Sequence, residues 1–189
     1  VRTAAIQALA ELPRGVAGPL LDRLRAEDPA IAARAAQGAP SLEDPEGIRE
    51  WVALRGATAP LSELHDAIVR LRERERDAPA ARRPAWLAAR GAAHQALAQR
   101  GSRVALYDLR EAFEGAAGAL PIDFVAAAAA VGDASCLEPL AKAWAAAETD
   151  PWWRERLADA ARAIVAREKL TNRHTIVKRV RMRHPAFPG

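Results

Sequence analysis

The sequence is poor in residues that carry catalytic or metal chemistry. Cys136 is its only cysteine, which excludes an internal disulfide and a cysteine-based zinc site. None of the four histidines has a histidine partner four residues away or a cysteine cluster beside it; they are His65, His94, His174 and His184. The chain also has no glycine-rich nucleotide loop, nucleophile elbow or His-Glu-x-x-His motif. We therefore predict no catalytic residue, no metal ligand and no cofactor, and we expect that the protein is not an enzyme.

Residues typical of β-strands are scarce too. Aromatic residues make up 5% of the chain, and tyrosine occurs once. No stretch of strand length alternates apolar and polar residues. Alanine, leucine, arginine and glutamate, all strong helix formers, dominate the composition instead. These features predict an all-α fold.

Long apolar runs are absent as well. No segment has the roughly 20 consecutive apolar residues of a membrane-spanning helix, and the chain does not start with a secretory signal sequence. We expect no membrane span, and the lone cysteine favours a reducing, cytoplasmic location. Because the chain begins with Val1 and its only methionine is Met182, we also expect it to be the C-terminal part of a longer protein.

Helix boundaries can be predicted from caps and stops. An Asp-Pro pair opens an apolar periodic run at residues 28–29, 44–45 and 150–151, where Asp can cap free amides and Pro lacks one. Gly15, Gly56, Gly101 and Gly132 are expected to end helices in the left-handed conformation. The predicted helices are 2–11, 16–26, 29–38, 45–54, 60–76, 84–99, 103–114, 121–131, 134–147 and 151–168. Their short connections predict antiparallel neighbours.

The chain also contains an internal repeat. Residues 2–10 (RTAAIQALA) return as residues 90–98 (RGAAHQALA), with differences only at the second and fifth positions. A Pro-Leu pair in the following helix, Pro19-Leu20, has a counterpart in Pro139-Leu140. Small residues at fixed offsets let successive helix pairs approach closely, while leucines fill the seam between them.

These features resemble the HEAT family of helical-hairpin repeats. The resemblance rests on residues 1–9 (VRxxAxxAL), 28–36 (DPxIAxRAA) and 131–133 (VGD), and it covers about 1–39 and 86–165. It implies antiparallel helix pairs stacked as a right-handed α-solenoid over residues 1–170, usually a scaffold that binds proteins. Residues 171–189 would then form a basic C-terminal helix and frayed end, docked on the last repeat, because a solenoid needs a polar cap.

Positive charge is concentrated at the C-terminus. Residues 169–189 hold six basic side chains and no acidic one: Lys169, Arg173, Lys178, Arg179, Arg181 and Arg183. Removing these six from the 28 basic residues leaves 22 against 24 acidic ones, so residues 1–168 carry about −2. The overall net charge of +4 is therefore a property of the tail.

A helix over 172–184 would have a basic face and an apolar face. Ile176, Val177 and Val180 gather on one side, Lys178 and Arg179 lie opposite, and Arg181 and Arg183 flank the apolar arc; Arg173 intrudes on it one turn earlier. Pro185 would end the helix and leave a frayed terminus. Three interpretations compete: a structural cap with arginines in water, contact with nucleic-acid phosphates, or contact with an acidic protein or membrane surface.

The tryptophans divide into core and surface candidates. Core packing is expected for Trp51, Trp86, Trp144 and Trp153. Trp152 cannot point inward together with its neighbour, so we expect it near the surface beside Arg154 and Arg156. It is either a partner-binding anchor or, as we prefer, a cap over the apolar end of the solenoid beneath the tail.

One acidic cluster is a candidate site. Asp108, Glu111 and Glu114 are spaced three apart and could hold a cation or meet a basic partner. A solvated helix face interleaved with Arg110 is the preferred interpretation.

The sequence therefore predicts a non-catalytic scaffold that binds another protein. The candidate partner-binding residues are Trp152, Arg154, Arg173, Lys178, Arg179, Arg181 and Arg183. Nucleic-acid binding through the basic helix is the first alternative. The second is an alkylpurine-type DNA glycosylase, a helical-repeat enzyme that uses Trp and Asp side chains, for which residues 150–154 (DPWWR) have suitable residue types.

Overall fold

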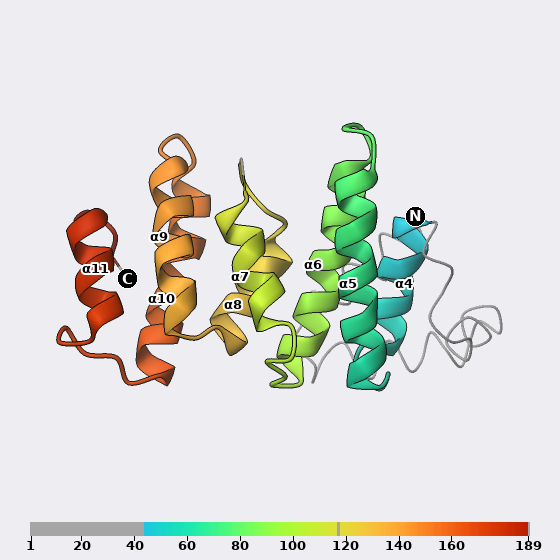
Figure 1. Cartoon of the computed structure of the whole chain (residues 1–189), viewed down its shortest axis with the longest axis horizontal. Coiled ribbons are helices and arrows are strands. Elements are labelled where there is room, and N and C mark those ends of the chain that lie inside the picture. The colour runs from blue at the N-terminus through green and yellow to red at the C-terminus, as the bar shows by residue number, and fades with distance from the viewer. Residues whose placement is uncertain (1–43, 117, 189) are drawn as a thin grey trace. The chain divides into compact units, whose positions relative to one another are not determined.

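The computed structural model describes residues 44–116 and 118–188, which are all-helical (Figure 1). The helices are α4 (Pro45–Arg55), α5 (Leu61–Asp77), α6 (Arg83–Gln99), α7 (Leu106–Glu114), α8 (Ile122–Val131), the 3-10 turn η1 (Ala134–Cys136), α9 (Leu137–Ala146), α10 (Pro151–Arg167) and α11 (Thr175–Arg183). No strand occurs in this part of the chain, which confirms the all-α prediction.

The predicted segments from residue 45 onward are all helical, and their ends agree to within about three residues. The reason is local capping. Asp44 accepts hydrogen bonds from the amides of Glu46 and Gly47, both at 3.1 Å, and Asp150 accepts one from the amide of Trp153 at 2.9 Å. The predicted helices 2–11, 16–26 and 29–38, with the Asp28 cap and the Gly15 stop, lie outside the described residues.

The glycine stops are of two kinds. Gly101 has a φ of +69°, and the amides after α6 close a left-handed cap, with Ser102 N–H donating to the Leu97 carbonyl at 3.0 Å. The expectation of the same conformation is wrong at Gly56 (φ −54°) and Gly132 (φ −55°). At both positions a larger residue would clash with the helix backbone. A Cβ would lie 2.5 Å from the Val52 carbonyl oxygen at Gly56 and 2.5 Å from the Ala128 carbonyl oxygen at Gly132.

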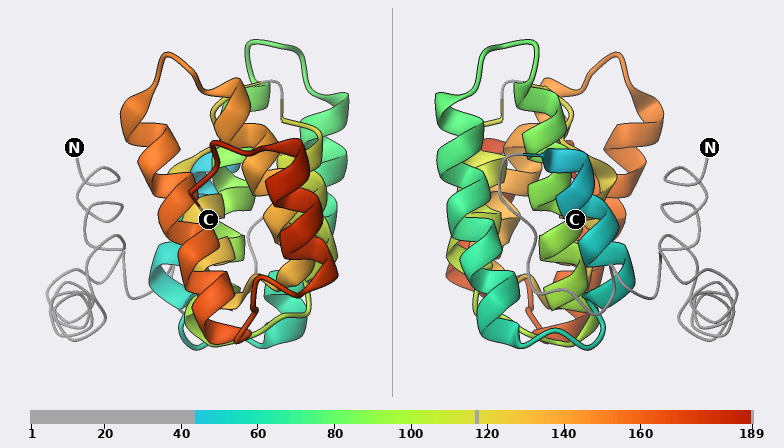
Figure 2. Two further views of the ribbon diagram at one scale, coloured as in Figure 1. Left: turned by 90° about the vertical axis from the view of Figure 1, so that its left-hand side faces the viewer. Right: turned by 90° about the vertical axis from the view of Figure 1, so that its right-hand side faces the viewer.

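The chain forms two compact units, divided between Ala96 and Leu97 inside α6. In the first unit α4, α5 and α6 lie side by side (Figures 1 and 2). Their buried side chains include Ile48, Trp51, Leu64, Ile68, Leu71 and Trp86. The α6 residue Arg90 is buried as well, and its Nε lies 3.0 Å from Glu75 Oε2 on α5.

The second unit has two layers of helices. α7, α9 and α11 follow one another in one layer, since α9 contacts both α7 and α11. α8 and α10 contact each other in the second layer, and each also packs on the helix that precedes it in the chain. The core between the layers holds fully buried Leu109, Phe113, Phe124, Leu140, Leu157 and Ile164. This arrangement leaves one face of α7, α9 and α11 in contact with solvent.

One arginine connects the ends of two helices in this unit. Arg167, at the end of α10, donates to the backbone carbonyls of Ala129 and Gly132 at the C-terminus of α8. The last carbonyls of a helix have no partner within the helix, so this guanidinium caps α8 from a different element. The neighbouring Glu168 pairs with Arg103 and joins the start of the unit to the end of α10.

Candidate functional site

The basic tail folds back on the second unit as helix α11. Val177 and Val180 are buried, Ile176 is half-buried, and the helix packs on α9. His174 Nδ1 accepts a hydrogen bond from the amide of Ile176 at 3.4 Å at the start of the helix. The apolar side of the tail is therefore packed against α9, and its basic side is the side that a partner can contact.

Residues 184–188, which follow α11, were predicted to be frayed, and this prediction is wrong. Phe187 is only 6% exposed, and its ring meets that of Trp144 edge-on with centroids 5.7 Å apart. The burial of an aromatic ring supplies the apolar contact that the prediction, based on the flanking prolines alone, did not anticipate.

Trp144 is correspondingly not a core residue. It is half-buried, and the Arg154 guanidinium lies 3.6 Å from the centre of its ring. This is a cation–π contact, and it uses Arg154 inside the molecule rather than at a partner surface. Trp51, Trp86 and Trp153 are buried, as predicted.

Trp152 lies at the surface as predicted, but the tail does not cover it. The side chain is 59% exposed and stacks on Trp153 with ring centroids 6.4 Å apart. The preferred interpretation, a cap beneath the tail, is therefore wrong. Trp152 remains an accessible aromatic residue at the first turn of α10.

The five basic residues of the tail from Arg173 to Arg183 fall into two groups. Glu138, in the first turn of α9, pairs with both Arg179 and Arg183, with Arg179 Nη1 3.7 Å from Glu138 Oε2. The expectation that the tail arginines only face water is wrong for these two. The second group has no carboxylate within ion-pairing distance among the described residues: Arg173, Lys178 and Arg181, all exposed.

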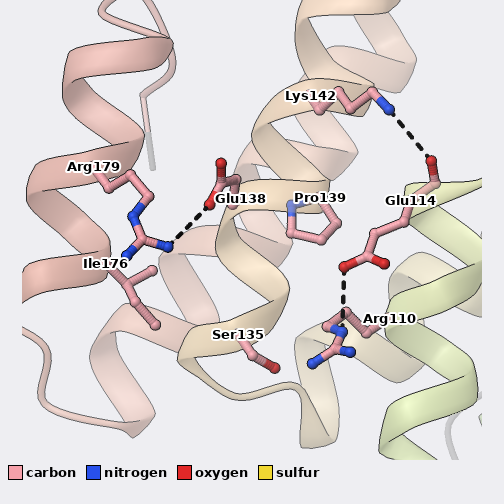
Figure 3. Close-up of a pocket in the computed structure, with 8 residues that line it drawn as sticks. All are labelled: Arg110, Glu114, Ser135, Glu138, Pro139, Lys142, Ile176 and Arg179. Atoms are coloured by element: carbon pink, nitrogen blue, oxygen red, sulfur yellow. Dashed lines mark hydrogen bonds and ion pairs between the residues drawn. The ribbon is translucent and has the colours of Figure 1, made fainter.

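A pocket of about 320 Å³ opens where α7, α9 and α11 meet (Figure 3). It is lined by Arg110 and Glu114 from α7, Ile176 and Arg179 from α11, and Ser135, Glu138, Pro139 and Lys142 from the η1–α9 segment. Arg110 Nε lies 3.3 Å from Glu114 Oε1, and Lys142 Nζ donates to the Glu114 backbone carbonyl at 3.4 Å. The pocket therefore combines three cations with two carboxylates.

The sequence did not point to this pocket. Only Arg179 was among the predicted binding residues, because the others come from helices whose meeting is a tertiary event. The one local signal is the i,i+4 spacing of Glu138 and Lys142, which places the two side chains on the same face of α9.

The acidic cluster on α7 is not a single solvated face. Asp108 is buried, Glu111 is half-buried and Glu114 is exposed, so the three carboxylates have different surroundings. Within the described residues no group of three or more His, Cys, Asp or Glu side chains has the arrangement of a metal site.

Two other candidates have structural roles. Asp150, the acid of the glycosylase interpretation, uses Oδ1 to cap α10. Cys136 is fully buried in η1, and this burial raises the pKa of its thiol. A protonated, inaccessible thiol is a packing residue at neutral pH.

In the described part of the chain, no helix combines the length and the apolar character needed to cross a membrane. The basic face of α11, the adjoining pocket and Trp152 are features of the second unit that a partner could reach. In comparison with known proteins, no protein-family model, no curated protein and no solved structure matches the chain.

Proposed function

We propose that this chain is a HEAT-type helical-repeat scaffold that binds an acidic surface of another protein. The alternating contacts of the second unit, α7 with α9 and α11, and α8 with α10, are what stacked antiparallel helix pairs produce. A right-handed solenoid is the arrangement that the HEAT resemblance implies for such pairs. A solenoid offers a broad surface made by successive helices, and binding is the usual use of such a surface.

The observation that carries the proposal is the charge of α11. Its apolar side is buried, while Lys178 and Arg181, with Arg173 just before the helix, are exposed without an acidic partner in the described structure. No acidic residue occurs anywhere from 169 to 189. A docked helix with uncompensated cations produces a local positive potential, which attracts and orients an acidic partner.

An acidic protein suits this surface better than nucleic acid. A helix of 9 residues is about 14 Å long and reaches only a few phosphates. Residues 1–168 carry about −2, so the chain outside the tail adds no net positive charge for a longer duplex to contact. The surface also presents Met182, which is 77% exposed and belongs to a residue type enriched at protein interfaces. Nucleic-acid binding through the same cations is the second candidate, favoured only by the uncompensated charge.

A competition between two polyanions tests the proposal. Fluorescence anisotropy would compare a labelled polyglutamate of about 20 residues with a labelled DNA duplex of about 20 base pairs, over a range of salt concentrations. We expect tighter binding of polyglutamate. The variant Arg173→Ala, Lys178→Ala, Arg181→Ala should weaken it at least about tenfold.

The matched control removes three arginines from an exposed stretch of α5: Arg70→Ala, Arg74→Ala and Arg76→Ala. It should retain most of the affinity. Tighter binding of the duplex, lost in the α11 variant, would favour the nucleic-acid function. Absence of binding to both polyanions at low salt would contradict the proposed function.

A further inference from the structure

We propose that the pocket between α7, α9 and α11 binds a carboxylate side chain from a glutamate-rich segment of the partner, an inference that rests on the proposed function. The pocket lies within one compact unit, and its walls come from three helices of one layer (Figure 3). An extended segment crossing α9 would pass between Arg110 on α7 and Arg179 on α11.

The cations of this pocket have donors to spare. A guanidinium has five N–H groups and an ammonium three, whereas Arg110 and Arg179 each have one carboxylate neighbour here, at 3.3 and 3.7 Å. Lys142 has no carboxylate partner among the described residues, and its contact is a backbone carbonyl at 3.4 Å. Lys142 is therefore the uncompensated charge, and the pocket attracts an anion.

The uncharged walls select the kind of anion. Pro139, from α9, is buried, and Ile176, from α11, is half-buried. These aliphatic surfaces suit the methylene groups of a glutamate side chain, while its carboxylate reaches Lys142, which points toward the α7 side of the pocket (Figure 3). With about 320 Å³, the pocket has room for one such side chain and part of its backbone.

Glu138 competes with the ligand inside the site. Its Oε1 accepts a hydrogen bond from Arg183, its Oε2 lies 3.7 Å from Arg179 Nη1, and its side chain lines the pocket. A partner carboxylate must share these donors with Glu138 and approach against its negative charge. Glu138 therefore lowers the affinity of the site while it holds α11 on α9.

This arrangement predicts opposite effects for two residues on the same face of α9. The probe is an acetylated, amidated hexaglutamate peptide with a fluorescent label, titrated onto the full chain at about 50 mM salt, where screening is weak. Lys142→Gln should lower the affinity about fivefold, and Glu138→Gln should raise it about threefold. Arg162→Gln, which removes the same charge as Lys142→Gln from α10 in the other layer, should leave it unchanged.

The outcomes separate this site from the proposed function. If Lys142→Gln and the unaltered chain bind hexaglutamate with equal affinity, the pocket is not the carboxylate site. If the α11 triple variant still loses polyglutamate binding in that case, the proposed function stands without the pocket. Glu138→Gln could also release α11 from α9, which would appear as faster hydrogen exchange of the α11 amides. In that case the Lys142→Gln result alone tests the pocket, because Lys142 takes no part in the Glu138 pairs with Arg179 and Arg183. Absence of hexaglutamate binding to the unaltered chain, with polyglutamate bound, also overturns the pocket.

Discussion

At the scale of single residues, one carboxylate and one glycine show which features of this fold are set by local chemistry and which by packing. The Asp150 side chain caps α10 by accepting a hydrogen bond from the Trp153 amide in the first turn, and a sequence pattern can predict this role. Gly132 ends α8 for a different reason. Its missing Cβ leaves room for the Ala128 carbonyl and for Ile164 Cδ1, which would lie 2.5 and 2.9 Å from an added carbon. The pattern identified the position, but not the cause.

Gly132→Ala should therefore destabilise the second unit. The backbone oxygen of Ala128 cannot move without disturbing α8, so we expect a loss of about 1–3 kcal/mol in the free energy of unfolding. Gly118→Ala is the control, because a Cβ there meets nothing within 4 Å. Its effect should lie between no change and about 1 kcal/mol of stabilisation. Urea unfolding followed by circular dichroism measures both, and equal midpoints would contradict the packing argument.

At the scale of helices, the second unit is held by contacts from the ends of α10 and from the tail. Arg154, near the start of α10, covers Trp144, whose ring edge meets Phe187. Arg167, at its other end, caps α8. Neither contact follows from amphipathic periodicity, because each joins a polar end of one helix to a different element. The helix boundaries were predictable, whereas these partners were not.

Removing the Arg167 guanidinium should weaken the C-terminus of α8. In Arg167→Ala the carbonyls of Ala129 and Gly132 lose their donor, and we expect about 1–2 kcal/mol of destabilisation, since the side chain is partly exposed. Arg162→Ala, on the same helix, breaks only exposed ion pairs and should cost less than about 0.5 kcal/mol. Chemical denaturation compares the two variants. Similar losses from both would show that Arg167 acts only as a surface charge.

At the scale of the whole molecule, the division at Ala96 and Leu97 separates two sets of core residues. Leu64 on α5 and Leu157 on α10 are both fully buried, one in each unit. A cavity at either position should be felt mainly by the helices that share its core. The uncompensated cations of the tail, Arg173, Lys178 and Arg181, also belong to the second unit.

Leu157→Ala should raise hydrogen exchange in α8, α9 and α10 and leave α4 and α5 unchanged. The cavity costs about 2–5 kcal/mol, which is enough to change exchange rates markedly. Leu64→Ala is the reciprocal experiment, with faster exchange in α4 and α5. Exchange measured by mass spectrometry on peptic fragments distinguishes the units. Faster exchange throughout the chain in both variants would mean that the two units unfold together.

The sequence by itself determined the helices of the described region, because caps, stops and helix-forming residues act within a few positions of the chain. It also placed the positive charge in the tail, since charge is a matter of composition. Only the tertiary structure decided which of those charges remain available. It paired Arg179 and Arg183 with Glu138, stacked Arg154 on Trp144, and left Arg173, Lys178 and Arg181 exposed. These outcomes depend on residues from separate helices meeting in space, and no local pattern encodes such meetings.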